Sequence, residues 1–169
     1  MARPNGVGTI AGRRARTAVP LALAVVALAA GLLVYLGDRV AGRAALIPAV
    51  GALAGHAGFG AIGQWLPSFV HPFGFGLLTA ALLRDHRARL GACAAWCVVN
   101  IAFEVAQHTS LKQAWADVLQ GPHGQMPGLR SVAAYGLRGT FDVGDLLAIV
   151  LGTLAAASVL ILLDRNREP

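Results

Sequence analysis

The chain has 169 residues, of which 56% are apolar and 13% are charged, and its formal net charge is +6. The charged fraction is about half that of an ordinary soluble domain, and the mean hydropathy is +0.63, so a water-soluble globular fold would have to bury nearly every residue. The arginines form short clusters beside apolar stretches, which suits membrane topology signals and anionic lipid, so no nucleic-acid partner is expected.

Four apolar stretches approach the roughly 20 residues that a helix needs to cross a membrane. They cover residues 19–36, 66–83, 90–107 and 143–163. Lipid cannot satisfy bare backbone amides, and these stretches are too long and too evenly apolar for barrel strands, so we expect helices. The predicted fold class is all-α, an integral membrane bundle of about four transmembrane helices.

The distribution of basic residues predicts that both termini are cytoplasmic. In that orientation nine Lys and Arg residues lie inside and five outside. The inner nine are Arg3, Arg13, Arg14, Arg16, Arg84, Arg87, Arg89, Arg165 and Arg167, and the outer five are Arg39, Arg43, Lys112, Arg130 and Arg138. We therefore divide the chain into a basic segment (1–17), a transmembrane domain (18–163) with an outer loop (108–142), and a cytoplasmic tail (164–169).

Two features of the N-terminal half leave alternatives open. Residues 44–62 are weakly apolar and would make a fifth span, but each side would then receive seven positive charges, so a re-entrant or interfacial piece is expected. The tripeptide Ala-Leu-Ala at residues 27–29 resembles a signal-peptide cleavage site. The apolar run continues to Leu36, however, so we expect the first helix to be retained.

The outer loop is the only long hydrophilic stretch. Within it, Leu111, Trp115 and Leu119 recur every four residues, which predicts a short amphipathic helix over residues 112–119. A helix of this kind with a tryptophan suits the membrane interface. Glycine and proline at residues 121–124 and 127–128 predict turns after it.

Polar side chains within or beside the spans are informative, because burying them in lipid is costly. Glu104 and Gln107 lie one turn apart at the outer end of the third span, and Asp142 and Asp145 lie one turn apart where the fourth begins. The second and fourth spans enter the membrane on the side where the third leaves it, so polar groups there are expected to meet. The residues expected to converge at this mouth of the bundle are His71, Glu104, Gln107, Arg138, Asp142 and Asp145.

Three interpretations of this cluster stay open. The first is a structural clasp, in which Asp142 caps the fourth helix and Glu104 pairs with Arg138 or His71. The second is a binding or catalytic pocket, and the third is incidental exposure to water. The sequence contains no nucleophile elbow, phosphate loop, dinucleotide fingerprint or His-Glu-x-x-His signature. Accordingly, the catalytic residues stay unknown, and we predict no metal site and no cofactor.

Small residues predict where helices approach each other closely. Ala148, Gly152 and Ala156 recur every four residues in the fourth span, and Gly74 lies in the second. Such positions let neighbouring backbones come into contact, and we expect a seam within the bundle rather than between two copies.

Three of these segments resemble the VanZ-like family of bacterial membrane proteins. The segments are Pro-Ser-Phe-Val-His at 67–71, Phe-Glu-Val-Ala-Gln at 103–107 and Arg-Gly-Thr-Phe-Asp-Val-Gly-Asp-Leu-Leu at 138–147. The family's pattern is Glu-x-x-Gln, then Arg, two Asp three apart, Asn and Gly. The matching residues are Glu104, Gln107, Asp142, Asp145 and Gly152. Ile149 stands at the Asn position, and Arg138 is one residue further from Asp142 than usual, which indicates a divergent branch.

The resemblance implies a multi-pass protein of the bacterial cytoplasmic membrane and cell envelope, in contact with the lipid bilayer. The family's namesake is associated with low-level resistance to the glycopeptide teicoplanin, which suggests that a lipid-linked or cell-wall molecule is bound or shielded. The alternative is an intramembrane enzyme or small transporter that uses the outer His/Glu/Asp cluster. The resemblance carries over no catalytic residue, and the oligomeric state stays open.

Overall fold

The computed structural model describes residues 10–40, 60–122 and 126–165, and every regular element in these ranges is a helix. The elements are α1 (Ile10–Val40), α3 (Gly60–Leu82), α4 (His86–Ala106), the 3-10 turn η1 (Thr109–Leu111), α5 (Lys112–Gln120), α6 (Pro127–Arg138) and α7 (Val143–Arg165). Helices α1, α3, α4 and α7 are long and apolar enough to cross a membrane, which confirms the predicted all-α bundle of four spanning helices.

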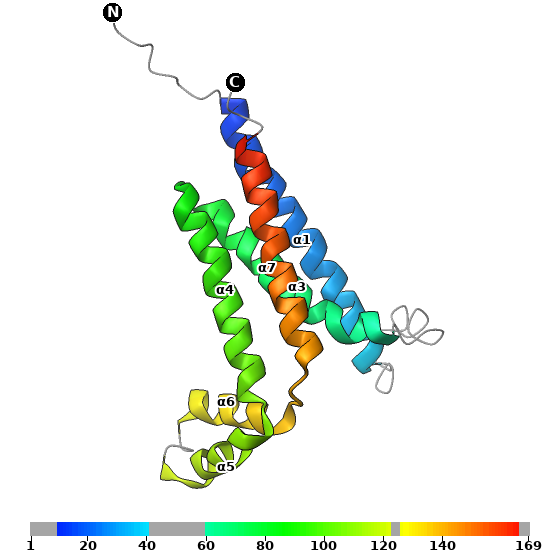
Figure 1. Cartoon of the computed structure of the whole chain (residues 1–169), viewed down its shortest axis with the longest axis vertical. Coiled ribbons are helices and arrows are strands. Elements are labelled where there is room, and N and C mark those ends of the chain that lie inside the picture. The colour runs from blue at the N-terminus through cyan, green and yellow to red at the C-terminus, as the bar shows by residue number, and fades with distance from the viewer. Residues whose placement is uncertain (1–9, 41–59, 123–125, 166–169) are drawn as a thin grey trace, which may run out of the picture.

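Helix α3 is the centre of the bundle, because it contacts α1, α4 and α7 (Figure 1). The beginning of α1, the turn from α3 to α4 and the end of α7 lie at one end of the bundle, here called the terminal end. The opposite end, the loop end, carries α5 and α6, which contact each other and lie across the end of α4. A short turn therefore joins α3 to α4, and a long segment that contains α5 and α6 joins α4 to α7.

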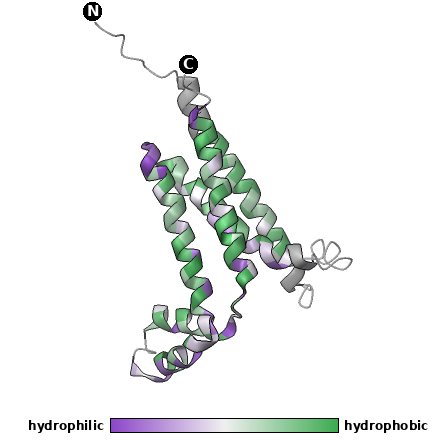
Figure 2. Cartoon of the chain, in the orientation of Figure 1, coloured by the Kyte–Doolittle hydropathy of each residue, from purple (hydrophilic) through white to green (hydrophobic). Residues whose placement is uncertain are grey.

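Apolar residues predominate along the long helices of the bundle, and hydrophilic residues gather mostly at its ends (Figure 2). Large apolar side chains are exposed on all four long helices, for example Val26, Leu82, Val98 and Leu151. This is the surface expected of helices that face lipid, where outward apolar side chains carry no penalty. The re-entrant or interfacial piece expected over residues 44–62 lies almost wholly outside the described residues. Only its last three residues, 60–62, are described, and they belong to α3.

Glycine and alanine bring the helices into close contact. A Cβ atom added to Gly74 would lie 2.6 Å from Cγ of Leu28 in α1, and one added to Gly152 would overlap the carbonyl oxygen of Phe69 in α3. Ala148 and Ala156 are buried on the same helix as Gly152. Gly152 therefore lets the backbones of α3 and α7 lie side by side, and Gly74 lets α1 pack closely on α3.

The long loop contains two helices. The short helix predicted over residues 112–119 is confirmed as α5. The turn predicted at residues 127–128 was wrong, because α6 begins at Pro127. Proline is favoured in the first turn of a helix, where its missing N–H is not needed.

Candidate functional site

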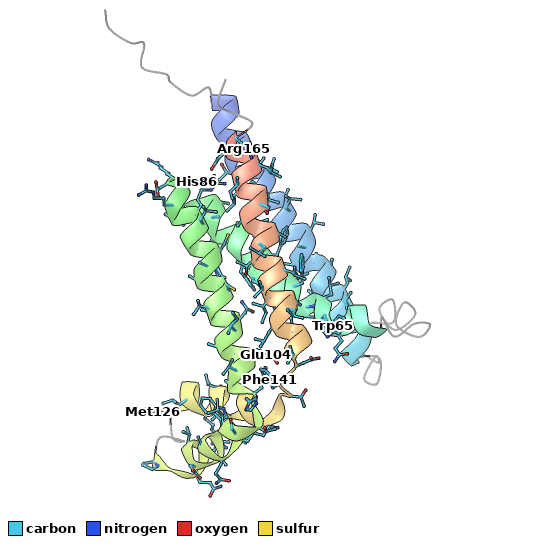
Figure 3. All side chains as sticks on the ribbon, in the orientation of Figure 1. Trp65, His86, Glu104, Met126, Phe141 and Arg165 are labelled. Atoms are coloured by element: carbon cyan, nitrogen blue, oxygen red, sulfur yellow. The ribbon has the colours of Figure 1, made fainter. Side chains whose placement is uncertain are left out.

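Glu104 connects α4 to the start of α7. Its side chain is buried, and Oε1 accepts a hydrogen bond of 2.7 Å from the backbone N–H of Asp142. Oε2 accepts a longer bond, 3.4 Å, from Nε2 of Gln107. Figure 3 shows Glu104 at the end of α4 beside Phe141, in the segment that leads into α7. The carboxylate therefore joins two segments that lie 38 residues apart.

The two aspartates of α7 connect this helix to α3. Oδ1 of Asp142 accepts the backbone N–H of Gly144 at 2.8 Å, which caps α7, and Oδ2 accepts Nε2 of Gln64 at 3.2 Å. Oδ1 of Asp145 accepts the hydroxyl of Ser68 at 2.6 Å. Hydrogen bonds thus link α3, α4 and α7 at the loop end. We call this network the loop-end clasp; its residues are Gln64, Ser68, Glu104, Gln107, Asp142 and Asp145.

Two residues expected in this cluster lie outside the network. His71 has an exposed side chain that stacks on Phe75 with 5.9 Å between ring centroids, and Phe75 stacks on Trp96 of α4 at 4.9 Å. Arg138 is exposed at the end of α6. Within the described residues, neither side chain forms an ion pair or hydrogen bond with Glu104, whose partner is instead the amide of Asp142.

Sequence reasoning missed Gln64 and Ser68, although a signal was present. The two residues lie four apart, so a helix places both on one face, and they are polar within an apolar segment. The apolar stretch that predicts the second span begins at residue 66, so the prediction leaves Gln64 outside it. The structure extends α3 back to Gly60 and brings both side chains against α7.

The unit formed by α5 and α6, the α5–α6 unit, is attached to the end of α4. Nε1 of Trp115 donates a 2.6 Å hydrogen bond to the carbonyl of Ala106, one of the last carbonyls of α4, which have no partner within the helix. Gly136 of α6 lies directly on the indole ring, because an added Cβ would be 2.7 Å from Nε1. One tryptophan therefore contacts α4 and α6 while belonging to α5.

Gly139 provides the second attachment. A Cβ atom at this position would overlap the side-chain amide of Gln107. The ring of His108 meets that of Phe141 edge to face, with 5.0 Å between centroids. These contacts hold the segment that leaves α6 against the end of α4, so the α5–α6 unit is connected to the bundle at both of its ends.

The loop-end clasp is suited to holding helices together. Both oxygens of Glu104 and both of Asp142, and one oxygen of Asp145, already accept hydrogen bonds from the chain. Among the described residues, no three His, Cys, Asp or Glu side chains gather closely enough to hold a metal ion. Searches against known proteins found no match to a family model, a curated protein or a solved structure.

Proposed function

We propose that this protein is a VanZ-like integral membrane protein of the bacterial cell envelope, located in the cytoplasmic membrane with both termini inside. In this proposal it acts without catalysis: the bundle holds the α5–α6 unit at the outer surface, where the unit binds or shields a lipid-linked or cell-wall molecule. The observation that supports it is the use of the acidic side chains of the loop-end clasp in joining helices.

The family proposal is supported by what the matching residues do. Glu104 and Gln107 form one hydrogen-bonded pair, and Glu104 also bonds to Asp142. Asp145 bonds to α3, and Gly152 contacts the backbone of the same helix. The residues that carry the resemblance therefore share one physical task, the connection of three helices at the loop end.

The α5–α6 unit has a surface suited to an amphiphilic ligand. Leu129 and Val132 of α6 and Met126 just before it expose apolar side chains, and Arg130 of α6 is exposed among them. A lipid-linked wall molecule combines an apolar chain with anionic phosphate, so apolar side chains and a guanidinium in one place match both of its parts.

The alternative, an intramembrane enzyme or small transporter, has its best support in His71. This imidazole is exposed on a membrane-spanning helix, and no hydrogen bond to it is present in the described part of the chain. Ionisable groups in spans are costly and often mark ion or substrate pathways. The variant His71→Ala separates the two functions. A protein that moves protons through this residue loses its enzymatic or transport activity in the variant, whereas a binding protein keeps its ligand binding.

The experiment that tests the proposal is the thermal stability of the purified protein in detergent, with and without an undecaprenyl-linked wall precursor. Glu104→Gln and Asp145→Asn are expected to melt below wild type yet keep the shift caused by the precursor. Arg130→Gln is expected to melt like wild type and lose the shift. Asp117→Asn, an exposed carboxylate on α5 outside the clasp, is the matched control.

Two results would overturn the proposal. If the precursor does not stabilise wild type, the α5–α6 unit does not bind this class of molecule. If Glu104→Gln and Asp145→Asn melt like wild type but lose the shift, the carboxylates themselves form the binding site, and the alternative function is favoured.

A further inference from the structure

Arg89 is a buried cation at the terminal end of the bundle. Only 3% of its surface is exposed. Nη1 donates to both carboxylate oxygens of Asp164 in α7, each at 3.3 Å. Nδ1 of His86 also lies 2.6 Å from Asp164. One side of the guanidinium thus joins α4 to α7.

The other side of the guanidinium has no partner among the residues that the structure describes. Nε and Nη2 of Arg89 are both buried, and neither forms a hydrogen bond to any residue that the structure describes. These two nitrogens form one edge of the planar group, and their N–H bonds point in parallel toward the same position. This edge is the fork that holds two oxygens of a carboxylate or phosphate at once.

A buried donor without a partner is unfavourable, and in a membrane-spanning helix lipid offers it no acceptor. The unpaired edge beside a satisfied Nη1 is therefore open to an acceptor from outside the described residues.

The charge around Arg89 favours an anion. Arg84, Arg87 and Arg165 are exposed at the same end of the bundle, where the start of α4 forms a hydrophilic tip (Figure 2). Of the acidic residues nearby, Asp85 caps α4 through the amide of Ala88 and Asp164 is paired with Arg89. The excess of positive charge raises the local concentration of anions.

We propose that Nε and Nη2 of Arg89 bind a phosphate oxyanion, the group that a phospholipid headgroup and inorganic phosphate share. Arg89 lies in the first turn of a membrane-spanning helix, and headgroup phosphates lie at this depth in either leaflet. The chain covers both nitrogens, so an oxyanion reaches them when neighbouring side chains at the helix end move aside. The site lies at the opposite end from the loop-end clasp and does not depend on the function proposed for it.

The test compares wild type with Arg89→Lys and with the matched control Arg87→Lys, whose arginine is exposed two residues away. Each protein is melted in a non-ionic detergent with dioleoylphosphatidylglycerol, dioleoylphosphatidylcholine or inorganic phosphate. Phosphatidylglycerol is expected to raise the Tm of wild type and Arg87→Lys alike. Arg89→Lys keeps the charge but lacks the fork, so at least half of the shift is expected to be lost.

The three probes identify the source of the oxyanion. A shift with phosphatidylglycerol alone assigns the site to an anionic headgroup, a shift with both lipids assigns it to any phosphodiester lipid, and a shift with inorganic phosphate alone assigns it to the soluble ion. The proposal is overturned if no probe shifts wild type, or if Arg89→Lys and wild type shift equally.

If Arg89→Lys does not fold, a second measurement on wild type alone tests the proposal. The Tm shift with the effective probe is measured in about 0.1 M and about 1 M sodium chloride, where the Debye length falls from about 10 Å to about 3 Å. Contact at a buried guanidinium is expected to retain most of the shift. A shift that disappears in high salt would show attraction to the surface arginines and overturn the proposal.

Discussion

The carboxylate of Glu104 accepts the backbone N–H of Asp142, the residue that caps α7. In an ordinary capping box this N–H is bonded by the acidic residue three positions further along the same helix. Here that residue is Asp145, whose carboxylate accepts a hydroxyl from Ser68 of α3 instead. Because a different helix supplies the acceptor, the beginning of α7 is positioned by its neighbours on both sides.

Removal of the Glu104 carboxylate is expected to lower the stability of the bundle. Glu104→Ala loses a charge-assisted hydrogen bond and leaves the amide of Gln107 with one acceptor fewer, for a cost of about 2 kcal/mol. Glu104→Gln keeps an acceptor oxygen, so its loss of stability is expected to be about half that of Glu104→Ala. Thermal melting in detergent measures both, with Asp117→Asn as the control. Equal melting of Glu104→Ala and wild type would show that the bond does not contribute.

Ser68→Ala and His71→Ala form a matched pair on one helix. Ser68→Ala removes the 2.6 Å hydrogen bond to Asp145 and is expected to cost about 1 kcal/mol. His71→Ala removes an exposed ring and is expected to change stability by less than about 0.5 kcal/mol. A larger loss of thermal stability in His71→Ala than in Ser68→Ala would contradict this assignment of roles.

Gly152→Ala is expected to separate α3 from α7. The added methyl group would overlap the carbonyl oxygen of Phe69, and overpacking of this kind costs about 1–3 kcal/mol. Gly91→Ala in α4 is the control, because nothing lies within 4 Å of its added Cβ. This second change is expected to be neutral or to stabilise by up to about 1 kcal/mol through helix propensity. Thermal melting of both variants tests the close contact, which a stable Gly152→Ala would disprove.

Trp115→Phe is expected to loosen the α5–α6 unit without melting the bundle. The variant loses the hydrogen bond from the indole to Ala106, worth about 1 kcal/mol, and part of the contact with Gly136. Amide hydrogen exchange should therefore rise in α5 and α6 and stay unchanged in α3 and α7.

Trp96→Phe is the control for this change, because its indole donates to Thr79 between α3 and α4, within the bundle. It is expected to affect exchange in those two helices and to leave α5 and α6 as in wild type. The same exchange pattern in both variants would mean that the α5–α6 unit is not attached through Trp115.

The four spanning helices could be predicted because the signal for each lies within a single segment. About 20 apolar residues in a row are sufficient to predict a membrane helix, whatever the neighbours are. Helix α5 could be predicted for the same reason, because the four-residue spacing of Leu111, Trp115 and Leu119 lies within one short segment. The locality of the signal also explains the error at α6. Pro127 and Gly128 are typical of a turn, but Leu129, Val132 and Ala133 follow them at helical spacing.

The sequence by itself determined the class of the protein, its spanning helices and the end of the bundle where Glu104, Gln107, Asp142 and Asp145 lie. The tertiary structure alone decided which atoms meet, because the partners of Glu104 and Arg89 are 38 and 75 residues away. Arg89 illustrates the difference best. Along the chain it is one of several basic residues that indicate topology. Only the packing of α4 against α7 buries it, with one edge of its guanidinium unpaired among the described residues.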